Sequence, residues 1–117
     1  MATSSVSELE RARAEAGARV DSLTAQLANI VDTAAASAGD DEHDPEGQTI
    51  AYDRAQVGAL LARAREDVAE LDAARDRIAA GTYGVCELCG TTIPDERLAA
   101  RPAARTCVTC ADRPRRR

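Results

Sequence analysis

Four cysteines carry the clearest chemistry in this sequence of 117 residues. They form two CxxC pairs, Cys86 with Cys89 and Cys107 with Cys110, which are separated by seventeen residues. A two-residue spacer lets a tight turn present both sulfurs of a pair to one ion. Zinc takes four such thiolates in a tetrahedron, at about 2.3 Å each. The four cysteines therefore predict one structural Zn²⁺ with no open position for catalysis.

Other fates of the cysteines depend on where the chain resides. The segment from Met1 to Glu10 is polar, and no stretch approaches the roughly 18–20 apolar residues of a membrane span. We therefore expect a cytoplasmic protein without membrane contact, in which thiols stay reduced and metal is favoured over two disulfides. A redox CxxC would need a βαβ context that the sequence lacks. An iron–sulfur cluster remains a minor alternative.

Two apolar stripes with helical spacing precede the cysteines. The first predicts a helix over roughly 5–37, and the second predicts a helix over roughly 45–80 that begins at Pro45 and stops at Gly81. Arginines interrupt both stripes. The first stripe is Val6, Leu9, Ala16, Val20, Leu23, Leu27, Ile30 and Ala34, broken by Arg13; the second is Ile50, Val57, Leu61, Ala64, Val68, Leu71 and Ile78, broken by Arg54 and Arg75.

The stripes and the composition predict a mainly α fold. Aromatic residues make up 2% of the chain and charged residues 30%, which suits long helices with a narrow apolar seam better than a thick core. Two helices of similar length joined by a short loop predict an antiparallel coiled-coil hairpin, with the zinc finger at its foot. We expect residues 1–80 to form the hairpin, residues 81–117 to form the finger and a short basic tail, and the chain to be monomeric, although dimerisation through the same seam is an alternative.

Charge is distributed unevenly along the chain, whose net charge is -5. The loop between the helices, over 39–46, is acidic and includes Asp41, Asp44 and Glu46. From Arg97 onward there are seven arginines and only one acid, Asp112. Such segregation is typical of two ends with different partners. The alternative is that both ends are solvated surface.

The cysteines lie in a segment that closely resembles the zinc finger of the DksA/TraR family, bacterial regulators that bind RNA polymerase. The acidic loop also resembles the family's tip pattern DxxDxA, since Asp41 and Asp44 have its spacing, but Glu46 replaces the final alanine. The resembling residues of the finger are Gly81-Thr82-Tyr83-Gly84-Val85-Cys86-Glu87-Leu88-Cys89-Gly90, then Ile93, Arg97-Leu98, Ala100-Arg101-Pro102, Cys107 and Cys110.

The resemblance implies a non-enzymatic transcription regulator that inserts its acidic tip into the secondary channel of RNA polymerase and modulates initiation. Arg97, Arg101 and Arg105 are then candidate contacts to the channel rim. Family members with a long helix after the finger use it to grip the polymerase and to help bind guanosine tetraphosphate. Here seven residues follow Cys110, so this nucleotide is only a candidate ligand at the shared interface.

Two alternative functions remain open from the residues. A zinc-ribbon module could bind nucleic acid through its arginines, but Tyr52 and Tyr83 are the only rings available for stacking on bases. We expect no sequence-specific DNA binding, and we expect Tyr83 to be a packing residue. A Gre-like factor would instead use tip acids to position a second magnesium ion for transcript cleavage.

Overall fold

The computed structural model describes residues 3–37 and 45–113, with side chains placed over 5–36 and 47–113. Asp41 and Asp44 of the predicted tip lie outside these residues, and Glu46 is described only as part of a helix. The chain divides into two compact units. One comprises Met1–Ala14 with Val68–Arg117, and the other is Glu15–Asp67. The predicted boundary at residue 80 stays a prediction.

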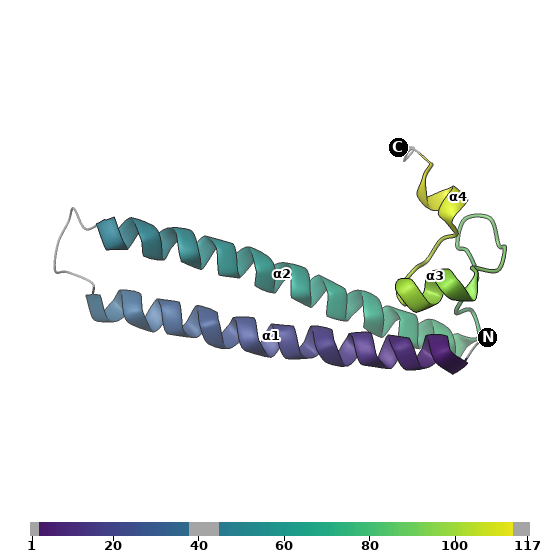
Figure 1. Cartoon of the computed structure of the whole chain (residues 1–117), viewed down its shortest axis with the longest axis horizontal. Coiled ribbons are helices and arrows are strands. Elements are labelled where there is room, and N and C mark those ends of the chain that lie inside the picture. The colour runs from purple at the N-terminus through teal and green to yellow at the C-terminus, as the bar shows by residue number, and fades with distance from the viewer. Residues whose placement is uncertain (1–2, 38–44, 114–117) are drawn as a thin grey trace. The chain divides into compact units, whose positions relative to one another are not determined.

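Two long helices make up most of the chain, as predicted (Figure 1). Helix α1 spans Thr3–Ser37, and α2 spans Pro45–Ala80. Gly81 ends α2 with a φ of 79°, a conformation that costs glycine little because it has no Cβ. The amide of Thr82 then donates to the carbonyl of Arg77 at 2.9 Å, which closes the helix and turns the chain toward the first cysteine.

In the unit Glu15–Asp67, segments of α1 and α2 lie side by side and run in opposite directions (Figure 1). Ala16, Leu61 and Ala64 are buried there, with exposures of 0%, 4% and 3%. Val20, Leu23, Leu27, Ile30 and Val57 are only half-buried. The predicted antiparallel hairpin is confirmed, and its seam here is thin because two helices alone cannot enclose large side chains.

The other unit has a thicker core, because the zinc finger packs with the first turns of α1 and the last turns of α2. The helices contribute Leu9, Leu71 and Ala74, and the finger contributes Tyr83, Ile93 and Leu98; none of these side chains is more than 7% exposed. Tyr83 is a packing residue, as expected. Its hydroxyl donates to the carbonyl of Pro102 at 2.9 Å, and burial raises its pKa.

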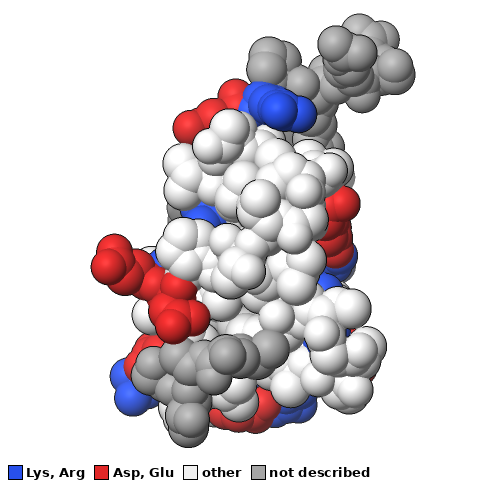
Figure 2. Space-filling view, turned by 90° about the vertical axis from the view of Figure 1, so that its right-hand side faces the viewer, with Lys and Arg blue, Asp and Glu red and all other residues white. Residues whose placement is uncertain are grey.

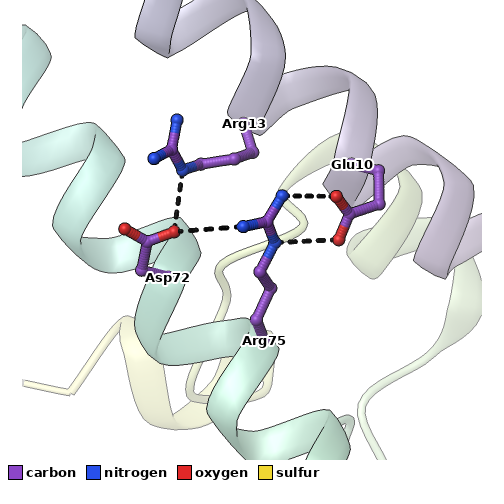
Figure 3. A network of polar contacts seen from close by, with 4 residues as sticks. All are labelled: Glu10, Arg13, Asp72 and Arg75. Atoms are coloured by element: carbon purple, nitrogen blue, oxygen red, sulfur yellow. Dashed lines mark hydrogen bonds and ion pairs between the residues drawn. The ribbon is translucent and has the colours of Figure 1, made fainter.

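In this unit, two of the arginines that interrupt the apolar stripes each bind a carboxylate of the opposite helix (Figure 3). Arg13 Nε donates to Asp72 Oδ1 at 2.7 Å. Arg75 Nε donates to Glu10 Oε2 at 2.9 Å, its Nη2 donates to the second oxygen, and its Nη1 lies 3.6 Å from Asp72. These two arginines thus belong to a network between α1 and α2 in which positive and negative side chains alternate.

Two short helices complete the finger. Helix α3 spans Asp95–Ala100 and buries Leu98, while α4 spans Val108–Ala111 and buries Cys110. An isolated antiparallel bridge joins Val85 to Thr92. Among the residues that the structure describes, no helix, long or short, is both long enough and apolar enough to cross a membrane.

Candidate metal centre

The four cysteine sulfurs converge on one point. Their Sγ atoms all lie within 4.8 Å of one another, and those of Cys89 and Cys107 are 3.8 Å apart. A tetrahedron with zinc–sulfur bonds of about 2.3 Å has edges of about 3.8 Å. The sulfurs are thus positioned to bind one metal ion, and the prediction of a single four-thiolate zinc site is confirmed.

The first cysteine pair is held by a tight loop between two glycines. The amide of Gly90 donates to the carbonyl of Cys86 at 2.9 Å, and the amide of Cys86 donates to Thr91 at 2.8 Å. Gly84 and Gly90 have φ values of 82° and 77°, where residues with a Cβ are strained. A Cβ on Gly84 would also lie 3.4 Å from Leu98 Cδ1. The glycines therefore allow the turn that presents Cys86 and Cys89.

The second pair is presented by the start of α4. Cys107 caps this helix, and its carbonyl accepts from the amide of Ala111 at 2.9 Å. Two further bonds align the pairs: the amide of Glu87 donates to Arg105 at 2.9 Å, and Arg97 Nε donates to the carbonyl of Thr106 at 2.9 Å. The segments that carry the two cysteine pairs are therefore joined by a backbone hydrogen bond, and the Arg97 side chain of α3 holds the second segment.

Backbone amides and burial set the protonation of the thiols in opposite directions. Amides of Cys107 and Cys89 point at the Cys86 sulfur and lower the pKa of that thiol to about 6. Burial, followed by the neighbouring cysteines, raises the pKa of Cys110 to about 12. Four thiolates cannot share this site without a cation. The donor set thus fits zinc, whose charge would offset their repulsion.

Thr91 is a residue of the site that the sequence reasoning missed. Its Oγ1 lies 3.0 Å from Cys89 Sγ, and the hydroxyl can donate to the thiolate. This contact is the main cause that lowers the pKa of Cys89. Cys89 is the exposed ligand of the four, so the hydroxyl supports the sulfur that water reaches most easily. The only signal in the sequence is a hydroxyl residue two positions after Cys89.

The three predicted rim arginines differ in what they contact. Arg105 lies 3.2 Å from Glu70 of α2 and 3.1 Å from Glu87 of the finger, so it joins the finger to the helix. Arg97 is bonded to Thr106. The side chain of Arg101 is exposed and has no polar partner among the described residues. Arg101 is therefore the one of the three that is free to bind another molecule.

The surface at the finger is largely uncharged. Figure 2 shows a face with few charged groups across its middle and both signs of charge toward its edges. Three large apolar side chains of the finger are exposed: Val85 at 43%, Leu88 at 67% and Val108 at 54%. These side chains are apolar surface that a partner could cover.

Known proteins match both the finger and the fold. Residues 81–116 match the family described as the prokaryotic dksA/traR C4-type zinc finger. An uncharacterized protein of Aquifex aeolicus is 51% identical over 43 residues, which cover 37% of this chain and 30% of that protein. General stress protein 16O of Bacillus subtilis is 40% identical over 72 residues, which cover 62% of this chain and 44% of that protein. The chain thus spans less than half of the length of these curated relatives.

The structure of transcription factor DksA2 from Pseudomonas aeruginosa superimposes with a TM-score of 0.74 at 26% identity, covering 89% of this chain and 74% of that chain. The fold and the metal centre define a helical hairpin protein with a C4-type zinc finger. Residues 81–116 thus match the finger of that family and the fold is similar to that of DksA2, so the resemblance to the DksA/TraR family predicted from the sequence is confirmed for the finger and the fold.

Proposed function

We propose that this chain is a transcription regulator of the DksA/TraR type that binds RNA polymerase directly and modulates initiation. The observation that carries the proposal is the combination of a family-specific finger at 81–116 with a fold that matches DksA2 over 89% of the chain. The protein is then a non-enzymatic cytoplasmic regulator, and its zinc is structural because four protein ligands fill the metal's coordination.

The acidic tip is the part that we propose produces the effect. Asp41, Asp44 and Glu46 would enter the secondary channel, where carboxylates suit a magnesium-bearing or arginine-lined pocket. They need not bind metal: a contact that favours one state of a mobile polymerase element shifts its population. Glu46 stands where the family has alanine, so Glu46→Ala should change the size of the effect and leave binding intact.

The finger would hold the foot of the hairpin on the polymerase. Arg101 is the strongest candidate for a rim contact because its guanidinium is free, whereas Arg97 and Arg105 make bonds inside the finger unit. The exposed apolar side chains of the finger would add contact area. Any site for guanosine tetraphosphate would lie at the interface shared with the polymerase.

A binding titration with core RNA polymerase tests the proposal. The labelled wild-type chain is titrated with polymerase, and duplex DNA without polymerase serves as the second titrant. Saturable binding to polymerase with weak binding to DNA supports the regulator. Tight, salt-dependent binding to free DNA would favour the nucleic-acid-binding module instead, and stimulated transcript cleavage in the same complex would favour the Gre-like function.

A further inference from the structure

The side chain of Arg105 lies between two carboxylates, one in the finger and one on α2. Its Nη1 is 3.1 Å from Glu87 Oε2, and its Nε is 3.2 Å from Glu70 Oε2. A guanidinium presents its donors in a fixed fork, so one side chain can hold both acids at once. The three residues form a chain of charges that runs from the finger to the helix.

Within the finger, both members of this chain lie next to metal ligands. Glu87 stands between Cys86 and Cys89, and Arg105 precedes Cys107 by two residues. The two residues are joined twice, because the amide of Glu87 also donates to the carbonyl of Arg105 at 2.9 Å. Glu87 and Arg105 therefore connect the two segments that a shared metal ion brings together.

The backbone on either side of Arg105 is held in place. The carbonyl of Pro102 accepts from the Tyr83 hydroxyl at 2.9 Å, and the carbonyl of Thr106 accepts from Arg97 Nε at 2.9 Å. Arg105 thus has a fixed starting point from which its side chain reaches both acids. A side chain whose position is already determined loses less conformational entropy when its contacts form.

Assembly of the metal centre and formation of these contacts favour each other. Four thiolates repel one another until a cation joins them, and zinc binding is coupled to folding in small zinc domains. A contact that forms only in the assembled finger adds to zinc affinity. By linkage, zinc strengthens that contact by the same factor.

We infer that Glu70 of α2 is a positioning residue for the metal centre and that Arg105 transmits its effect. Glu70 holds the guanidinium of Arg105 against Glu87, and Glu87 belongs to the turn that presents the first cysteine pair. Loss of zinc then weakens the hold of the finger on α2. The inference does not depend on polymerase, because all three residues belong to one compact unit of this chain.

The exposure of the three side chains sets the size of the effect. Arg105, Glu70 and Glu87 are 40%, 52% and 43% exposed. Ion pairs of this exposure contribute little, so we expect loss of each to weaken zinc binding about two- to fivefold. The effect should shrink in 1 M salt, where charges are screened beyond about 3 Å. A role of Glu70 in packing alone would not depend on salt in this way.

The test is zinc competition against a chromophoric chelator, with variants of the full chain at low and high salt. We expect Glu70→Gln to weaken zinc binding about two- to fivefold and Arg105→Gln to weaken it more, because it removes both ion pairs. In the Arg105→Gln background, Glu70→Gln should have no further effect, and Arg105→Lys should recover part of the loss. Circular dichroism checks that each zinc-loaded variant keeps its helices.

Glu66→Gln is the matched control. Glu66 is exposed on the same helix, one turn before Glu70, and has no polar side-chain partner among the described residues. The substitution changes the net charge equally and leaves the chain of charges intact. We expect its zinc affinity to equal that of wild type.

Three results would overturn the inference. Zinc affinity of Glu70→Gln equal to that of the control would show that α2 does not act on the metal centre. Additive effects of Glu70→Gln and Arg105→Gln in the double variant would show that Glu70 acts by a route other than Arg105. Wild-type zinc affinity of Arg105→Gln together with weakened polymerase binding would make Arg105 a rim contact instead.

Discussion

Arg75 of α2 binds both carboxylate oxygens of Glu10 on α1. Bidentate pairs of this type have defined geometry, so they fix position as well as adding energy. Asp72 lies between Arg75 and Arg13, and the four charges alternate in sign (Figure 3). Arg13 and Asp72 are half-buried, whereas Glu10 and Arg75 are exposed, and salt bridges between helices beside a seam set the orientation of the partners. We interpret the network as a register lock for this part of the hairpin.

Glu10→Gln should make the pH dependence of stability shallower in acid. The hydrogen bonds from Arg75 are the main cause that lowers the pKa of Glu10 below its ordinary value of 4.5. A carboxyl whose pKa is lowered by folding stabilises the protein above the pKa of the unfolded chain, and this contribution disappears as the pH falls through the folded value. Wild type should therefore be the more stable protein at pH 7, and the difference should shrink below about pH 4.5.

Urea unfolding of both proteins at pH 7 and pH 3 checks this prediction. Glu15→Gln is the control, because Glu15 is exposed and has no polar side-chain partner among the described residues. A difference between Glu10→Gln and wild type that stayed constant with pH would show that the Arg75 contact does not stabilise the fold.

Thr91→Val should weaken zinc binding about tenfold or more, because loss of an outer contact to a metal ligand typically costs 10–100-fold. The substitution keeps the shape of the side chain and removes the hydroxyl that lies 3.0 Å from Cys89 Sγ. Competition against a chromophoric chelator measures the affinity. Thr92→Val is the matched control, and Thr91→Ser should restore affinity. Equal zinc affinities of the two valine variants would show that the Thr91 hydroxyl does not support the metal site.

Cys107→Ser should disorder the finger and leave much of the helical signal. Zinc binding contributes free energy of order 10 kcal/mol in small zinc domains, and this energy is coupled to folding. Most of α1 and α2 lies outside the finger, so circular dichroism should fall only partly, while bound zinc falls from one ion per chain. Wild-type protein with two disulfides and no zinc by mass spectrometry would contradict the metal centre.

The long helices and the metal ligands could be predicted because their signals are local. Stripes with helical spacing gave both helices, Pro45 and Gly81 marked the ends of the second, and two CxxC pairs identified the four ligands. The register network could not be predicted, because Arg13 and Arg75 resemble defects in the stripes until Asp72 and Glu10 are placed opposite them. Such pairings between residues about sixty positions apart depend on tertiary structure.

The finger shows the same limit at shorter range. Helices α3 and α4 have six and four residues, too few to be stable without tertiary contacts. The contact of Thr91 with Cys89 depends on the path of the turn. The bonds of Arg97 and Arg105 depend on how the segments that carry the two cysteine pairs pack together. In the sequence, Arg97 and Arg105 are grouped with Arg101 because all three carry the same charge. In the structure, Arg97 and Arg105 bind other residues of the finger unit, whereas Arg101 has no polar partner among the described residues.

The most direct test of the proposed function is a run-off transcription assay of Asp44→Asn beside a polymerase titration of the same variant. The sequence predicts that Asp44 caps the helix that begins at Pro45, and asparagine caps about as well as aspartate, so the substitution should change charge with little effect on that helix. If the finger and helices supply affinity while the tip supplies the effect, Asp44→Asn should bind polymerase like wild type and lose most of the change in initiation. A variant that lost neither activity nor binding, or lost both in equal proportion, would contradict the account.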